Sequence, residues 1–196
     1  MANRRQFLGG SIAGTALLSA FPARAGTLLT DSAHKTLSHF VFDERSIEAR
    51  QLAQDMKPIG VTTLEIQSDA SDVWYKKLAP RVQAGANVIG GLTTAGGLFT
   101  LTRLGFDAGL RLALHGQHRL FDDGREAEHV LKTSAIVARS FDAALASGLS
   151  WTSALQVVFP DLVSQPTADR VALGDISSPD AARQTTLHSW ILMPRA

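Results

Sequence analysis

The central part of this chain alternates short apolar runs with segments of helical periodicity. Four runs rich in aromatic and β-branched residues are typical of strands, and three segments between them carry apolar residues at i, i+3, i+4 and i+7. The strands are expected at residues 39–43, 61–66, 87–92 and 110–115, and the helices at 46–56, 72–84 and 95–108. Strands that alternate with helices of this length predict right-handed crossovers and a mostly parallel sheet with helices on both faces.

The second half of the chain has a different pattern. Asp123 and Glu126 have the spacing of a capping box, and we expect a long helix behind them that ends at Gly148. A shorter helix closed by a proline and two further strands are expected at 150–159, 170–173 and 186–192. The sequence therefore predicts an α/β domain of three layers, with the alternation of Rossmann-like and flavodoxin-like folds, a helical insertion, and a C-terminal edge strand or hairpin.

The N-terminus carries a motif of another kind. Arg4 and Arg5 are followed, after one residue, by Phe and Leu, then by an uncharged stretch over residues 7–21, and small residues stand at Ala23 and Ala25. This pattern resembles the twin-arginine (Tat) signal peptide, whose usual form is Arg-Arg-x-Phe-Leu. The uncharged stretch is shorter than the roughly 20 residues of a membrane-spanning helix. A short buried helix and an uncleaved anchor are the alternatives.

The resemblance implies a cellular location and an export pathway. It implies a cleaved signal at residues 1–25, a single α/β domain at 26–196, and export in the folded state by the Tat translocase to the periplasm, with the extracellular medium as an alternative. Passengers of this route often carry a bound cofactor or a co-exported protein partner. The sequence itself identifies no cofactor.

Composition narrows the function further. The chain has no cysteine, which excludes disulfides and thiolate metal sites, so its stability must come from a packed core. The signal region holds three arginines and no acid, which leaves 16 basic and 18 acidic residues in the mature part. A nearly neutral chain without a basic run gives no electrostatic reason to bind nucleic acid. Because the mature part has no second long apolar stretch, we expect no stable insertion of it into a membrane.

Polar residues follow each of the four expected strands. In a parallel sheet the ligand site lies outside the carboxyl ends of the strands. The candidates at these ends are Asp43 and Arg45, Asp69, Thr93 and Thr94, and His115 and His118. Gly91 and Gly96 flank the third strand end, where glycines and the start of a helix favour an anion. A cap role for Thr94 and a packing role for the glycines are the alternatives.

Histidines suggest a second chemistry. His115 and His118, with Asp43, are candidates for acid–base catalysis. Together with Glu126 and His129 the two histidines form a less favoured set of metal ligands, whose spacing matches no known motif. His188 is read as a core residue.

Two functions remain open at this point. The first is an exported accessory or small-molecule-binding domain that takes an anion. The alternative is a small enzyme that carries out acid–base or hydrolytic chemistry on an anionic metabolite. The absence of the P-loop, dinucleotide and nucleophile-elbow patterns favours the first.

Overall fold

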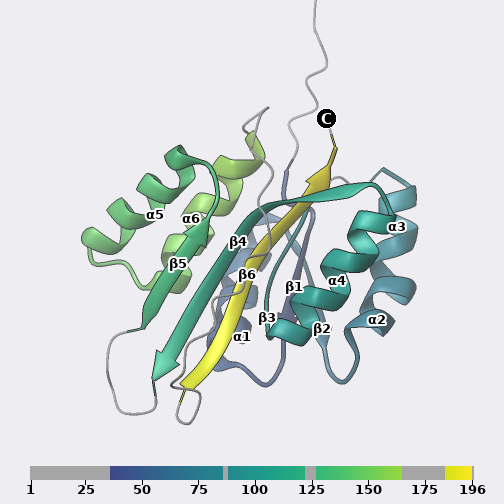
Figure 1. Cartoon of the computed structure of the whole chain (residues 1–196), viewed down its shortest axis with the longest axis horizontal. Coiled ribbons are helices and arrows are strands. Elements are labelled where there is room, and N and C mark those ends of the chain that lie inside the picture. Colours follow the sequence, from purple (N-terminus) through teal and green to yellow (C-terminus); the bar gives the residue numbers. More distant parts are fainter. Residues whose placement is uncertain (1–35, 86–87, 122–126, 165–183, 196) are drawn as a thin grey trace, which may run out of the picture. The chain divides into compact units, whose positions relative to one another are not determined.

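The computed structural model describes residues 36–85, 88–121, 127–164 and 184–195, which form a sheet with helices packed against it (Figure 1). The strands are β1 (His39–Asp43), β2 (Thr62–Ile66), β3 (Ile89–Thr93), β4 (Leu110–Phe121), β5 (Glu128–Lys132) and β6 (Gln184–Pro194). The helices are α1 (Ile47–Met56), the 3-10 turn η1 (Lys57–Ile59), α2 (Ala70–Val73), the π-helical turn η2 (Trp74–Leu78), α3 (Ala79–Gln83), α4 (Ala95–Asp107), α5 (Ala135–Ala146) and α6 (Trp151–Ser164). The chain divides into two units, Met1–Ala33 and His34–Ala196, and every described residue belongs to the second.

The α/β class is confirmed, but the sheet is mixed and not mostly parallel. Its strand order is β2-β1-β3-β6-β4-β5. β1 pairs in parallel with β2 and β3, whereas β6 runs antiparallel to β3 and β4, and β5 antiparallel to β4. The predicted C-terminal edge strand is wrong, because β6 lies inside the sheet. Trp190, Ile191 and Leu192 in β6 are fully buried on its two faces, a pattern that an interior strand satisfies better than an edge strand.

Two apolar clusters lie on opposite faces of this sheet. One contains Phe40 of β1 and Ile191 of β6 with residues of α1, α5 and α6, and we call this side the α1 face. The other contains Val41 of β1 and Trp190 of β6 with residues of α2, η2 and α4, and we call it the α4 face. Successive strand residues point to alternate faces, so each functional side chain can be assigned to one face from its register.

The region after His115 differs most from expectation. β4 does not end at His115 but continues to Phe121, and the expected helix before residue 135 is replaced by the strand β5. β5 pairs with the extension of β4, and Leu131 packs on the α1-face core while Val130 is exposed. Short apolar runs fit the period of a helix as well as that of a strand. Here the extension of β4 offers an edge with which β5 pairs, and this pairing favours a strand.

Proline positions modify two helices. The expected helix 72–84 is present as α2, η2 and α3. Its wide π turn ends two residues before Pro80, which has no backbone N–H and whose ring would clash with the carbonyl of a regular α-helical turn. α6 was expected to end before Pro160 but continues to Ser164. Beyond the proline, Leu162 and Val163 are buried in the α1-face core, and this burial offsets the lost backbone hydrogen bond. The strand expected at residues 170–173 and the capping box at 123–126 lie outside the described residues.

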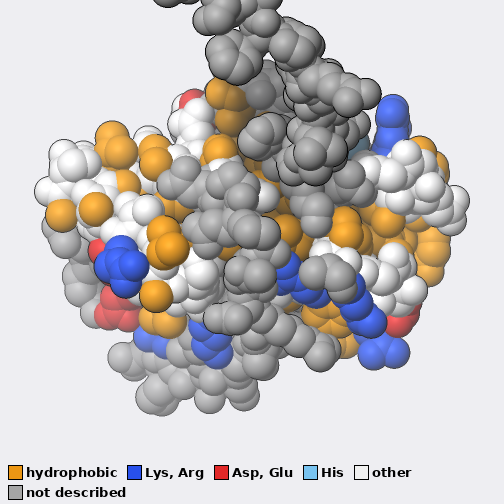
Figure 2. Space-filling model, turned by 90° about the horizontal axis from the view of Figure 1, so that it is seen from above, with side chains coloured by type: hydrophobic (Ala, Val, Ile, Leu, Met, Phe, Trp, Pro, Cys, Tyr) orange, Lys and Arg blue, Asp and Glu red, His pale blue; other side chains and the backbone are white. Residues whose placement is uncertain are grey.

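The exposed apolar side chains come from many elements. The larger ones are Ile47, Ile59, Tyr75, Phe99, Val130, Ile136, Leu149 and Val157. On the face drawn in Figure 2, lysine and arginine side chains likewise lie in several separate places among apolar and uncharged ones. No helix in the described part of the chain is long and apolar enough to cross a membrane.

Candidate functional site

The connections of the sheet diverge between β1 and β3. After β1 the chain forms α1 on the α1 face and then enters β2, which is the neighbour of β1 on the side away from β3. After β3 it forms α4 on the α4 face and then enters β4, which lies on the other side of β3, beyond β6. In open α/β sheets such a switch point opens a crevice outside the carboxyl ends of the two strands. The residues at this place are Asp43 to Arg45 after β1 and Thr93 to Gly97 after β3, which include five of the residues singled out from the sequence.

Asp43 and Arg45 form a tight clamp at the end of β1. The Arg45 Nε donates to Asp43 Oδ1 at 2.9 Å and its Nη2 to Oδ2 at 2.7 Å, and the Arg45 backbone N–H donates to Oδ1 at 3.1 Å. These bonds hold the pKa of the Asp43 carboxyl below its usual value. The carboxylate side chain is 3% exposed and the Arg45 side chain 71% exposed. Both carboxylate oxygens are therefore occupied, and the arginine is fixed in place while its outer edge faces solvent.

Thr93 and Thr94 have separate roles at the end of β3. Thr93 is fully buried, and its hydroxyl accepts a hydrogen bond from Trp190 Nε1 at 3.1 Å and donates to the Thr94 carbonyl at 3.2 Å. Thr94 is the N-cap residue of α4, but its side chain makes no cap hydrogen bond. Thr94 thus provides no side-chain acceptor for the first-turn amides of α4, whereas Ser46 and Ser134 cap α1 and α5.

The glycines of this junction serve different purposes. A Cβ on Gly91 would overlap the Trp190 indole and lie 2.7 Å from the Val41 carbonyl, so this position serves packing inside the sheet. A Cβ on Gly97 would lie 3.0 Å from Thr93 Cβ. A Cβ on Gly96 would meet nothing within 4 Å, and Gly96 is exposed in the first turn of α4. Of the two predicted ligand-binding glycines, only Gly96 lies where a ligand can approach.

Asp69 is placed away from this crevice. It is the N-cap of α2, where its Oδ1 accepts from the Ser71 backbone N–H at 2.8 Å, and this bond lowers the pKa of its carboxyl. It follows β2, which lies on the far side of β1 from β3. Its observed role is a helix cap.

His115 pairs with a residue that the sequence analysis set aside. Its Nε2 lies 3.1 Å from Nδ1 of His188, and the two rings stack with centroids 5.3 Å apart. Burial is the main cause that lowers the pKa of His115 to about 4, and it also lowers the pKa of His188. The His115 Nδ1 atom is buried and has no hydrogen-bond partner among the described residues.

His118 belongs to a second histidine pair on the α1 face. Its Nδ1 lies 2.9 Å from Nδ1 of His129, and its Nε2 lies 2.8 Å from Ser189 Oγ. Trp151 stacks on its ring at a centroid distance of 4.5 Å. Burial, with His129 beside it, holds the pKa of His118 well below its usual value. The order Ser–His–His resembles a nucleophilic relay, but Ser189 and His118 are fully buried, so no substrate reaches the hydroxyl.

Register shows how far the catalytic candidates lie from one another. Thr93 is directly opposite His188, and His188 opposite Gln117, so the His115–His188 pair lies on the same face as Thr93 and Asp43. β3 and β6 separate β1 from β4, and three strand spacings put the backbones of Asp43 and His115 about 14 Å apart. The structure therefore gathers Asp43, Arg45, Thr93, Thr94 and Gly96 at one place, and puts His115 at another.

The metal set is not assembled. His115 lies on the α4 face and His118 with His129 on the α1 face, and Glu126 is outside the described residues. Within the described ranges, no three histidine, aspartate or glutamate side chains group closely enough to hold a metal ion.

Sequence reasoning missed His188 and Ser189 as partners of these histidines. They are 73 and 71 residues away from His115 and His118 along the chain. The available signal was their position in one apolar strand, where two adjacent polar residues face opposite sides of a sheet and each needs a buried partner. Searches of protein-family models, curated proteins and solved structures found no match to this chain.

Proposed function

We propose that this chain is exported by the twin-arginine route and that its α/β domain binds a small oxyanion, a phosphate or a carboxylate, at the crevice between β1 and β3. The observation that carries the proposal is the start of α4. The helix begins at the switch point without a side-chain cap and with no acidic residue in its first turn. Free amides and the positive end of a helix attract an anion.

Arg45 supports the same ligand. A guanidinium has five N–H donors, and the two side-chain bonds from Arg45 to Asp43 leave donors on the exposed edge for a ligand. The clamp also reduces the side-chain entropy that Arg45 loses when it binds. The Thr94 hydroxyl, which makes no cap bond, is a further donor beside the α4 amides.

The acid–base enzyme is supported less well. Asp43 would be the base nearest to the anion, but both its oxygens accept bonds from Arg45 and its pKa is lowered. His115 lies about 14 Å from it, which is too far for the two groups to act on one small substrate. A binding role fits the clamp and the open helix start better than catalysis.

Arg45→Gln should weaken phosphate binding about 10- to 100-fold. A hydrogen bond to a charged group contributes about 1.5–3 kcal/mol, and the substitution removes both the charge and the paired donors. Titration calorimetry of the purified domain with inorganic phosphate, and separately with acetate, measures the effect. Arg103→Gln is the matched control, because Arg103 is equally exposed on α4 but lies in its last turns and pairs with Asp107. Equal affinity of the wild type and Arg45→Gln would exclude this site.

Gly96→Ala separates a role in binding from a role in folding. The added methyl meets no protein atom, and alanine favours a helix by about 0.5–1 kcal/mol over glycine, so the melting temperature should rise slightly. Phosphate affinity should fall, because the methyl lies beside the first-turn amides. Thr94→Ala should leave stability nearly unchanged and also weaken binding. Full phosphate affinity in both variants would move the ligand away from α4.

The export proposal has its own test. Replacing Arg4 and Arg5 together by lysine should stop export while the protein still accumulates and folds in the cytoplasm. Fractionation of cells followed by immunoblotting measures this, and N-terminal sequencing of the exported wild type should begin at Gly26. Undiminished export of the double-lysine variant would overturn the assignment, and an intact Met1 on the exported protein would indicate an anchor.

A further inference from the structure

A hollow of about 280 Å³ lies beside the crevice, on the α1 face of the sheet. It is bounded by the ends of β1 and β2 and by one side of α1. Its lining residues are Phe42, Glu44, Arg50, Ala53, Gln54, Lys57 and Glu65. This volume is just below the range of about 300–1,000 Å³ that holds drug-sized ligands, so the hollow suits a smaller metabolite.

Two carboxyl groups face each other across one side of the hollow. Glu44 follows β1 and Glu65 lies in β2, and their side chains are within hydrogen-bonding reach of each other. This bond raises the pKa of Glu44 and lowers the pKa of Glu65. Two adjacent carboxylates repel each other, so a cation placed between them would stabilise the pair.

Two cationic side chains face the hollow, one from α1 and one from the turn η1 that continues it. Arg50, Gln54 and Lys57 are spaced at i, i+4 and i+7, which puts them on one side of the helix. The ion pairs found among the described residues do not include Arg50, Lys57, Glu44 or Glu65. Opposite charges thus line one hollow without a close ion pair, although the charge of Lys57 contributes to the lowered pKa of Glu65, and Phe42 and Ala53 are the apolar lining residues.

We propose that this hollow binds a small zwitterion, a free α-amino acid. The ammonium group would lie between the carboxylates of Glu44 and Glu65. The carboxylate would lie against Arg50 and Lys57, with the Gln54 amide as a further donor. A ligand with one charge alone would leave half of these groups unpaired, which is why a molecule with both charges fits best.

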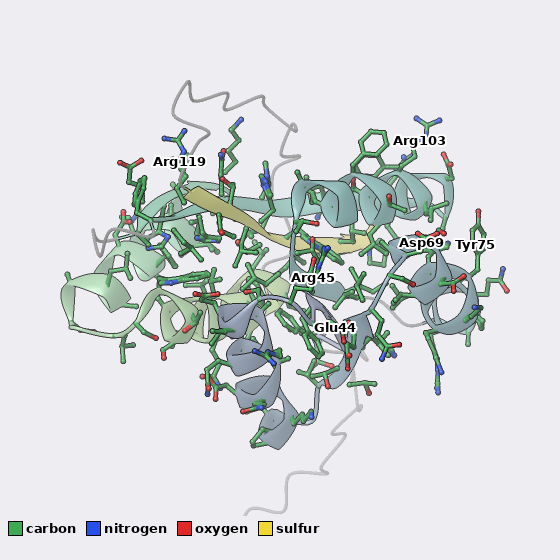
Figure 3. All side chains as sticks on the ribbon, turned by 90° about the horizontal axis from the view of Figure 1, so that it is seen from below. Glu44, Arg45, Asp69, Tyr75, Arg103 and Arg119 are labelled. Atoms are coloured by element: carbon green, nitrogen blue, oxygen red, sulfur yellow. The ribbon has the colours of Figure 1, made fainter. Side chains whose placement is uncertain are left out.

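This site is separate from the anion crevice. Consecutive residues at a strand end point to opposite faces, and Figure 3 shows Arg45 on the α4 side of this end and Glu44 on the α1 side. Arg45 is held by Asp43, which does not line the hollow. The two proposals therefore stand or fall on different substitutions.

Titration calorimetry of the purified domain with L-alanine and L-glutamine tests the proposal. We expect binding in the millimolar range or tighter. N-acetyl-L-alanine, which lacks the ammonium charge, and L-alaninamide, which lacks the carboxylate, should each bind at least tenfold more weakly. Failure of both amino acids to bind at millimolar concentration would overturn the proposal, and so would equal binding of L-alaninamide, since that result would indicate a simple cation site.

Substitutions then locate the ligand. Glu65→Gln and Lys57→Gln should each weaken amino-acid binding about tenfold or more, and both residues are exposed, so the fold should persist, as circular dichroism can verify. Glu128→Gln and Arg103→Gln are matched controls, because these residues are exposed charges on other elements. Arg45→Gln should leave amino-acid binding unchanged. Unaltered affinity in both Glu65→Gln and Lys57→Gln would exclude the hollow, whatever the phosphate titrations show.

Discussion

Replacing Gly91 by alanine should destabilise the domain by about 3 kcal/mol, the upper part of the range for overpacking a core. The new Cβ would lie 2.5 Å from Trp190 Cε2 and 2.7 Å from the Val41 carbonyl oxygen. The indole can move only by leaving its hydrogen bond to Thr93, and the carbonyl belongs to the paired strand β1. The melting temperature should fall by roughly 10 °C, since 1 kcal/mol shifts a domain of this size by about 2–4 °C.

The same substitution should also weaken phosphate binding. Trp190 lies across β3 because Gly91 has no side chain, and its Nε1 fixes the Thr93 hydroxyl one residue before the N-cap of α4. Thermal melts and phosphate titrations of Gly91→Ala can be compared with Gly96→Ala, whose added methyl meets nothing. A Gly91→Ala protein with unchanged melting temperature would show that the indole does not occupy this position.

The first half of the fold was predictable because its signals are local. The strand expected at 39–43 coincides with β1, and the helices expected at 46–56 and 95–108 differ from α1 and α4 by one residue at an end. These segments have clear periods and clear stops, such as Gly60 and Gly109, which adopt positive φ. Local periodicity also placed the crevice residues, since strand ends follow directly from strand positions.

The second half was not predictable in the same way because it depends on long-range pairing. His115 to Phe121 is polar enough to end a strand when read alone, but β5 and β6 on either side pair with it. β5 itself exists because that edge is available. The polar residues of this region find buried partners far along the chain, as His115 does with His188. A single sequence does not reveal which of these distant residues meet.

The candidate site residues show the same contrast between local signals and long-range pairing. Asp43, Arg45 and Thr94 were expected together and lie together, whereas His115 and His118 were expected at a strand end and lie within a strand on opposite faces. Gly91 was expected near a ligand and instead accommodates Trp190, a residue 99 positions later in the chain. The candidate residues whose neighbours the sequence predicted are those fixed by local turns.

Acid should destabilise the domain as the pH falls from about 6.5 to about 4. Five histidines, at positions 39, 115, 118, 129 and 188, have lowered pKa values, chiefly because burial penalises the charged ring. Below pH 6.5 the unfolded chain binds more protons than the folded protein, so the free energy of unfolding decreases as the pH decreases. The lowered pKa of Asp43 acts only below about pH 4, where its stabilisation is lost.

The size of the effect follows from the shifts. With a pKa of about 4 in place of 6.5, His115 alone should cost about 2 kcal/mol at pH 5 relative to pH 8. His118, whose pKa is also lowered by burial, should add to this loss. Urea unfolding of the domain at pH 8, 6.5, 5.5 and 5 measures the loss. His118→Gln should lower stability at pH 8 because it disturbs Ser189 and His129, but it should also flatten the dependence on pH by close to one proton. The flattening is the decisive readout, because a merely structural role for His118 would lower the whole curve without changing its slope. Stability that stays constant from pH 8 to pH 5 would mean that these histidines are solvated and protonate freely in the folded protein.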